Sequence, residues 1–432
     1  MTASNDSSFR PLVSRRGFLG SSALAAGGFL LSGRTQLQAA GPGEVGETDH
    51  FWYRLAPADG PYIDTQRGHL AFGFQDGELR LSEDTGKTWP HRAAFAETKD
   101  ILFSSILENG RVVFATARHL FLAEPRLASV REIRVLDQDG DTYRPHPLRE
   151  DKAPGWYFYS LDGRHTFDVE GREMLIWGNY CNVGTGPVPS NIYYSADGGE
   201  TVKIAYSFGQ NPAFQYPVNE RKEWLGNPDN PVVCRHVHSV AYNPAENAFY
   251  ACTGDIDRKN GAGLECHWLR GVWDAASDTW DWKVVVSSDS NSRFKSGGIN
   301  FVDGQVYWVA DANGPKAPSG DAYDRGIFRC APADLPDKSK HSRLYDARYE
   351  MAAMTIDGEV MLAPAYGNAN PCDCGFLIST DLGRNWGVYD LSELGDRSGV
   401  RVNPRNADGW FRIDLRRHWI DRGEVLFLKP KI

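Results

Sequence analysis

The sequence lacks any long segment with the 3.6-residue periodicity of an amphipathic helix, and it has little positive charge to offer a nucleic acid. Its 432 residues carry a formal net charge of −9, and no cluster of Lys and Arg follows the amino-terminal region. These absences argue against a helical bundle and against DNA or RNA as a partner. Local positive charge still allows an acidic polysaccharide or oligosaccharide as the substrate.

Cysteine is also scarce, and the seven cysteines form no paired framework. An odd number at irregular spacing does not predict a disulfide scaffold. Cys234 and Cys252 lie in apolar, strand-like runs, and we predict that they are small buried side chains. Cys372 and Cys374 are two residues apart and, with a histidine such as His267, would suit a structural zinc ion. A structural zinc or calcium ion is the one cofactor that the sequence suggests.

The amino terminus predicts export. Ser14–Gly20 contains the pair Arg15-Arg16, and an apolar stretch of small residues follows it to about Leu31. This order resembles a twin-arginine signal, with a cleavage site near Ala40. The apolar stretch is too short for a membrane span. No cysteine lies near residue 40, which argues against a lipid anchor. We therefore expect a folded, periplasmic or secreted protein, free of the membrane and monomeric, whose mature part is residues 41–432.

The residues that are abundant favour short strands and tight turns. Aromatic residues make up 12% of the chain, and there are 44 glycines. Both features are typical of all-β domains. The roughly 390 residues after the signal exceed a simple sandwich and suit a propeller, whose blades take about 40 to 60 residues each.

One short pattern occurs three times, as Ser-x-Asp-x-Gly followed by Thr or Asn and, in two copies, Trp. The copies are Ser82–Trp89, Ser195–Val202 and Ser379–Trp386. In each, the Asp is expected to accept hydrogen bonds from turn amides while Gly takes a positive φ; in the two copies that have it, Trp is expected to pack between sheets. The pattern resembles the Asp-box, or bacterial neuraminidase repeat, of sialidase-like β-propellers. That resemblance implies a fold and an extracytoplasmic role, and it does not specify a reaction.

We therefore predict an all-β chain with a single β-propeller, seven-bladed, with six blades as the alternative because residues 124–172 are irregular. Phe51–Leu55 is expected to pair with Val425–Leu428 and close the ring, which removes free sheet edges. Seven runs are predicted to line the central channel: Leu70–Phe74, Ile101–Leu107, Met174–Trp177, His236–Tyr242, Gly298–Val302, Met351–Ile356 and Phe411–Leu415. Asn109-Gly110, Asp303-Gly304 and Asp357-Gly358 predict hairpin turns.

The candidate catalytic residues lie at strand ends facing one mouth of this channel. His236 and His238 share one face of a strand, and Arg235 precedes them. Two histidines beside a guanidinium can bind a carboxylate, hold a metal or move a proton at neutral pH. Tyr180 and Arg293 are expected at similar ends of neighbouring strands. Tyr349 and Glu350 have the same predicted placement.

A second resemblance concerns the reaction. The run from Gly178 through the second repeat to Asp255 resembles propeller lyases and glycosidases acting on rhamnose and glucuronate linkages, including ulvan lyases, and this resemblance covers about half of the chain. The resemblance implies β-elimination: Arg235 or Arg293 neutralises the uronate carboxylate, His236 or His238 acts as base, and Tyr180 acts as acid. The full spaced series of His, His, Tyr and Arg of the ulvan lyases is not present.

Two alternatives stay open. A sialidase-like or rhamnosidase-like hydrolase would use Arg54 in the run Phe51–Leu55 together with Arg412 and the Tyr349-Glu350 pair, with Asp59 as the nearest acid. A non-catalytic glycan-binding propeller would use aromatic platforms without a convergent acid and base.

Overall fold

The computed structural model is built almost entirely from strands. It describes residues 35–37, 43–57, 59–143, 156–180, 188–209, 226–254, 264, 266–289, 292–312, 324–347, 351, 353–365, 375–391, 398–416 and 423–432. The helical elements within these ranges are short 3₁₀ turns: η1 (Thr98–Asp100), η2 (Pro125–Leu127), η7 (Pro332–Asp334) and η8 (Lys338–Lys340). No helix in the described part of the chain has the length and apolar character needed to cross a membrane.

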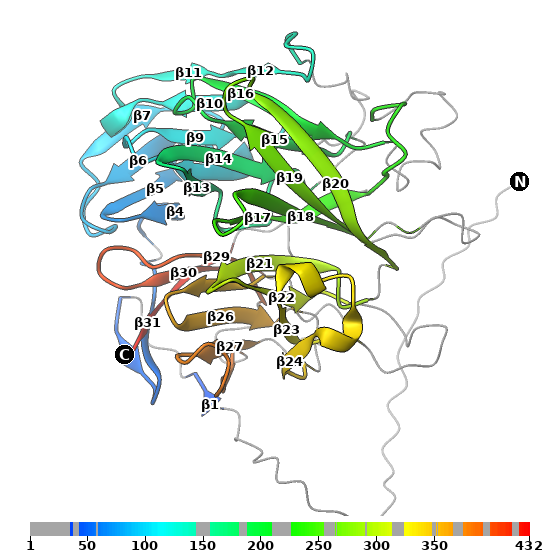
Figure 1. The fold of residues 1–432 in the computed structure, drawn as a ribbon. Coiled ribbons are helices and arrows are strands. Elements are labelled where there is room, and N and C mark those ends of the chain that lie inside the picture. The colour runs from blue at the N-terminus through cyan, green and yellow to red at the C-terminus, as the bar shows by residue number, and fades with distance from the viewer. Residues whose placement is uncertain are drawn as a thin grey trace, which may run out of the picture. The chain divides into compact units, whose positions relative to one another are not determined.

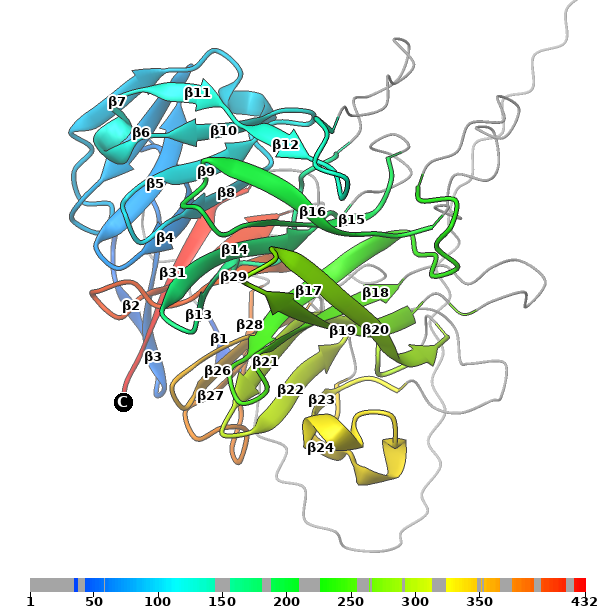
Figure 2. The same cartoon turned by 45° about the horizontal axis from the view of Figure 1, so that its top comes forward.

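The described strands form seven sheets, which are the blades of a β-propeller (Figures 1 and 2). Blades 1 and 2 consist of β4 (Tyr62–Arg67), β5 (Leu70–Gln75), β6 (Glu78–Ser82) and β7 (His91–Ala94), then β8 (Phe103–Ile106), β9 (Val112–Ala115), β10 (Leu120–Ala123) and β11 (Val130–Glu132). Blade 3 consists of β13 (Thr166–Val169), β14 (Arg172–Gly178), β15 (Asn191–Ser195) and β16 (Thr201–Ser207), with β12 (Arg134–Leu136) at its edge.

The remaining blades follow the same order along the chain. Blade 4 consists of β17 (His236–Asn243), β18 (Ala248–Gly254), β19 (Cys266–Asp274) and β20 (Thr279–Ser288), and blade 5 of β21 (Ser296–Val302), β22 (Gln305–Ala310), β23 (Ile327–Cys330) and β24 (Ser342–Tyr345). Blade 6 consists of β25 (Thr355–Asp357), β26 (Val360–Ala365), β27 (Gly375–Ser379), β28 (Gly387–Asp390) and β1 (Thr35–Gln36). Blade 7 consists of β29 (Ser398–Asn403), β30 (Phe411–Arg416), β31 (Val425–Pro430), β3 (Phe51–Leu55) and β2 (Gly46–Glu47).

The ring closes by pairing strands from the two ends of the chain, as predicted. β3 runs antiparallel to β31, from Phe51 opposite Pro430 to Leu55 opposite Leu426. Figure 1 shows the red β31 beside the blue amino-terminal strands. The seven-blade prediction is therefore confirmed.

Two short strands extend blades by parallel pairing. β12 lies along β16, and β1 lies along β28, where Leu37 is buried in the core of blades 6 and 7. Because β1 lies before the predicted cleavage site near Ala40, processing there would remove this strand from the mature protein.

The first strand of each blade faces the channel, and this corrects part of the sequence prediction. Neighbouring first strands are bonded directly: Ile299 N donates to Ser239 Oγ (3.3 Å), and Ile356 N donates to Asn300 Oδ1 (3.0 Å). Four predicted channel runs overlap first strands β8, β17, β21 and β25. Three were wrong: Leu70–Phe74, Met174–Trp177 and Phe411–Leu415 belong to second strands β5, β14 and β30.

The three repeat turns all connect the third and fourth strands of a blade, namely blades 1, 3 and 6. In each turn the Asp carboxylate accepts the backbone N–H four residues later: Thr88 to Asp84 (2.8 Å), Thr201 to Asp197 (3.1 Å) and Asn385 to Asp381 (2.9 Å). Trp89 packs between blades 1 and 7, as predicted. The predicted hairpin at Asp303-Gly304 also forms, with a positive φ at both residues (49° and 71°).

A chain segment between blades 2 and 3, residues 156–164, enters the channel; we call it the channel segment. It bonds to several blades, since Trp177 Nε1 donates to the Phe158 carbonyl (3.1 Å) and Asn403 Nδ2 donates to the Gly163 carbonyl (2.7 Å). A Cβ at Gly163 would lie 1.8 Å from the Val402 carbonyl oxygen, so only glycine permits this approach. Its aromatic residues Tyr157, Phe158 and Tyr159 are buried, the first two in the core between blades 2 and 3.

Candidate functional site

Strand direction decides which residues meet at each mouth of the channel. First strands begin, and second strands end, at the mouth opposite the repeat turns, because successive strands of a blade alternate in direction. His236 begins β17, and Lys295 comes just before β21. Tyr180 and Asp311 come just after the second strands β14 and β22. These four residues therefore gather at the mouth remote from the repeat turns.

The structure brings together three of the five predicted site residues. His236 and His238 are 0% and 1% exposed, and their Nε2 atoms lie 3.1 Å apart. Tyr180 stacks on the His236 ring, with centroids 3.8 Å apart and planes at 20°, and meets His238 edge-on at 5.3 Å. Tyr180 keeps partial exposure. The phenol is therefore the member of this trio that lies nearest to solvent.

Two charged residues that the sequence reasoning missed complete this group, which we call the His cluster: Tyr180, His236, His238, Lys295 and Asp311. Asp311 Oδ2 lies 3.6 Å from His238 Nδ1 and 3.6 Å from Lys295 Nζ. The Lys295 side chain is fully buried and the Asp311 side chain nearly so. A Cβ at Gly254 would lie 2.8 Å from Lys295 Cγ, so this glycine leaves room for the lysine. The sequence shows both charged residues beside apolar strands, but it does not show that they meet the histidines.

The two predicted arginines differ in their surroundings. Arg235 is half-buried next to His236, and its carbonyl accepts the Ser190 hydroxyl (2.9 Å). Arg293 instead donates through Nε to Asp324 (2.8 Å) and lies 4.7 Å from the ring centroid of Phe328. Although partial burial opposes it, Arg293 lowers the pKa of the Asp324 carboxyl. These contacts hold the Arg293 guanidinium within blade 5.

Of the residues named for a hydrolase site, Arg54 and Arg412 lie on strands that flank β31, where both are opposite Phe427. Arg54 lies on β3, a peripheral strand of blade 7, with its guanidinium 4.5 Å from the ring centroid of Phe427. Arg412 is fully buried and donates to the Ile63 carbonyl (2.7 Å). Asp59 lies in a turn before β4. Tyr349 and Glu350 lie outside the described residues.

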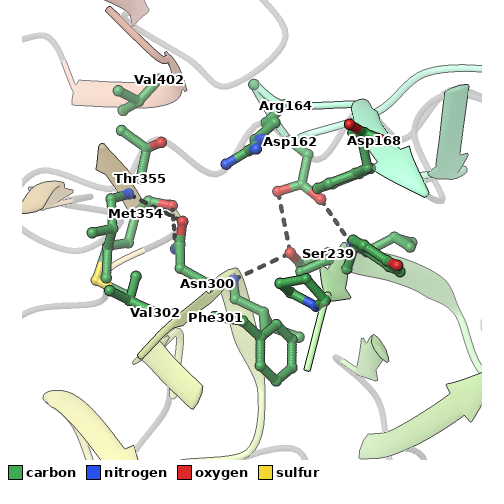
Figure 3. Close-up of a pocket in the computed structure, with 18 residues that line it drawn as sticks. Asp162, Arg164, Asp168, Ser239, Asn300, Phe301, Val302, Met354, Thr355 and Val402 are labelled. Carbon is green, nitrogen blue, oxygen red and sulfur yellow. Dashed lines mark hydrogen bonds between the residues drawn. The ribbon is translucent and has the colours of Figure 1, made fainter. Parts of the chain in front are cut away.

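The opposite part of the channel holds a cavity of about 220 Å³ (Figure 3). Asp162 of the channel segment points toward it and accepts hydrogen bonds from Val240 N (2.9 Å) and Ser239 Oγ (3.2 Å). Burial, only partly opposed by these bonds, raises the pKa of Asp162 to about 7. The cavity thus contains a carboxyl group that titrates near neutrality, although no feature of the sequence singled it out.

Metal ligands do not cluster in the part of the chain that the structure describes: no group of three His, Cys, Asp or Glu side chains could hold an ion. Cys234 and Cys252 are buried, as predicted, and both are reduced thiols. His267 bonds through Nδ1 to the Ser287 hydroxyl (2.9 Å). Cys372 and Cys374 lie outside the described residues.

Comparison with known proteins concerns the fold alone. No protein-family model and no curated protein sequence matches the chain. Similar solved structures include the Pan2 WD40 domain of Neurospora crassa, at 9% identity over 86% of this chain and 90% of that one (TM-score 0.44). Others are the amino-terminal domain of Nup159, at 8% identity over 92% and 100% (TM-score 0.41), and a chain of the mitotic checkpoint complex, at 10% identity over 95% and 99% (TM-score 0.45).

Proposed function

We propose that this protein is an exported polysaccharide lyase of the Asp-box propeller type, which cleaves uronic-acid-containing glycans of the rhamnose-glucuronate kind by β-elimination. The observation that carries the proposal is the contact of a partly exposed tyrosine, Tyr180, with a buried histidine pair at the channel mouth. The three repeat turns and the arginine pair near the amino terminus support the family and the export. Neither feature supports one sugar over another.

The proposed reaction assigns proton transfer to Tyr180, because both imidazoles are covered by protein. The ionised phenol removes the proton on C5 of the uronate. The electron pair forms the C4=C5 double bond, the C4–O bond breaks, and the leaving oxygen takes the proton from Tyr180. One group can thus serve as base and acid in turn.

The carboxylate of the sugar must be neutralised for C5 to lose a proton. We assign this role to Arg235, which is adjacent to His236 in the chain and half-buried. Arg293 fits the role less well, since Asp324 already pairs with its guanidinium.

The test is to incubate the protein with ulvan, gum arabic or another glucuronate polysaccharide and to follow the ultraviolet absorbance of the unsaturated uronate. Tyr180→Phe should reduce the rate at least about 100-fold. Tyr206→Phe, which removes a phenol on β16, the fourth main strand of blade 3, is the matched control and should keep the activity. Reducing ends without absorbance would reject elimination in favour of hydrolysis, and binding without either product would favour a glycan-binding propeller.

A further inference from the structure

Within the His cluster, His238 lies between Asp311 and His236. The Asp311 carboxylate is next to Nδ1 of His238 (3.6 Å), and Nε2 of His238 is next to Nε2 of His236 (3.1 Å). Nζ of the fully buried Lys295 lies 3.6 Å from the same Asp311 oxygen, Oδ2. The arrangement joins a buried ion pair to both imidazoles.

The contact between the two Nε2 atoms requires an unequal distribution of protons. A neutral imidazole carries one N–H and one unprotonated nitrogen, so a hydrogen bond between the rings needs one Nε2–H and one unprotonated Nε2. Geometry alone does not say which ring donates. The surroundings of the two Nδ1 atoms determine which ring is the donor.

The charge of Asp311 determines which nitrogen of His238 carries the proton. At 3.6 Å the Asp311 carboxylate does not accept a hydrogen bond from His238 Nδ1, but its charge acts on the ring. An N–H facing a negative charge is attracted, whereas a lone pair facing it is repelled, and the effect is stronger in a buried site than in water. His238 therefore carries its proton on Nδ1 and has an unprotonated Nε2. His236 must then donate from Nε2, which leaves Nδ1 of His236 unprotonated.

We propose that Asp311 is a positioning residue that fixes both tautomers, so that Nδ1 of His236 is the proton-accepting nitrogen of the pair. Lys295 supports this arrangement, because a positive charge 3.6 Å from Asp311 Oδ2 favours the negatively charged form of that carboxyl group. The proposal rests on the proposed function only in giving that nitrogen a role in turnover. The tautomers themselves do not depend on any substrate.

Nitrogen-15 NMR of the full-length protein with labelled histidine tests the tautomers directly, because protonated and unprotonated ring nitrogens have well-separated shifts. Single His236→Gln and His238→Gln variants assign the signals. In the unmodified protein we expect Nδ1–H on His238 and Nε2–H on His236. The reverse pattern, or two doubly protonated rings, would overturn the proposal without any need for a variant to fold.

Asp311→Asn should then shift the population of these tautomers, and Asp311→Glu should restore it. The control is Asp278→Asn, which removes a half-buried partner of Lys203 in blade 4 and should leave both signals unchanged. If the polysaccharide assay detects elimination, Asp311→Asn should lower kcat at least about tenfold with little change in KM, because His236 stacks on Tyr180 and a changed proton distribution on that ring alters the surroundings of the phenol that transfers the proton, while the groups that bind the sugar stay in place. Predicted tautomers without any unsaturated product would refute the lyase and keep this inference, whereas a lyase with the reverse tautomers would do the opposite.

Discussion

Two buried clusters of charge lie across the channel from each other and differ in how tightly their charges are paired. The closure cluster joins blades 7 and 1 and consists of Tyr62, Asp64, Arg401, Arg412 and Asp414. In it, the closest ion pair joins Arg401 Nη2 and Asp64 Oδ1 at 2.7 Å, while the contacts of Asp414 with Arg401 and Arg412 are 3.6 Å long. In the His cluster the ionic contacts of Asp311 with His238 and Lys295 are both 3.6 Å long. Short, charge-assisted bonds fix a structure, while titratable rings beside a looser ion pair are suited to proton transfer.

Two buried carboxyl groups, Asp64 and Asp162, also differ in how well their charge is paired. Burial raises the pKa of an acid, but Arg401 and Arg412 more than offset it and lower the pKa of Asp64. Asp162 accepts only an amide and a hydroxyl bond, and burial raises its pKa to about 7. The difference lies in the counterion, since both side chains are held deep within the ring.

The largest expected effect is on the closure cluster. Arg412→Met removes a fully buried guanidinium beside Asp414, and it should lower the free energy of unfolding by about 3–5 kcal/mol, because a buried carboxylate loses a counterion. Urea denaturation measures this. Arg54→Met, at the blade periphery, is the control and should cost less than about 1 kcal/mol. Equal losses would show that the closure cluster contributes no special stability.

A smaller and pH-dependent effect is expected at Asp162. Its folded-state pKa of about 7 exceeds the unfolded value, so the folded protein binds a proton between about pH 4 and 7 that the unfolded chain does not. Stability from this group is present at low pH and is lost as the pH rises toward 7, by at most about 4 kcal/mol. Asp162→Asn mimics the protonated acid and should remove that loss.

The measurement is the difference in unfolding free energy between the two proteins from pH 4 to 8. Both contain His165, whose burial lowers its pKa to about 3 and gives a slope of the opposite sign, so the difference isolates Asp162. We expect near equality at pH 4 and a more stable variant at pH 8. A difference that does not vary with pH would mean that Asp162 is ionised throughout.

The sequence allowed the ring to be predicted because its signals are local. The repeat turns and the Asp-Gly hairpins each predict a turn within a few residues. Two apolar segments near the ends of the chain, Phe51–Leu55 and Val425–Leu428, each predict a strand that needs a partner. The channel strands were harder. Tyr62–Arg67 and Thr166–Val169 carry polar residues toward the channel, so the second strands behind them, which are more evenly apolar, were mistaken for the lining.

The candidate site was predicted in part for the same reason. His236 and His238 meet because they are two residues apart on one strand, which the sequence displays. Asp311 joins them from the end of another blade, and Lys295 enters through space that Gly254 leaves open. Such contacts depend on how blades 4 and 5 pack, and no local pattern encodes that packing.

The smallest expected effect concerns the repeat turns, where a carboxylate is well bonded but near the surface. Bonds from the Thr88 amide and hydroxyl and from Ser82 outweigh the effect of burial and lower the pKa of Asp84 to about 2. Asp84→Ala should therefore cost about 1 kcal/mol at pH 7, as the loss of a helix cap does. Asp381→Ala should cost a similar amount, since Asn385 replaces Thr88 in the same bonds. Thermal unfolding of each variant measures the loss. A loss of stability as large as that of Arg412→Met would mean that the number of bonds to a charged group, and not its burial, determines how much that group stabilises this protein.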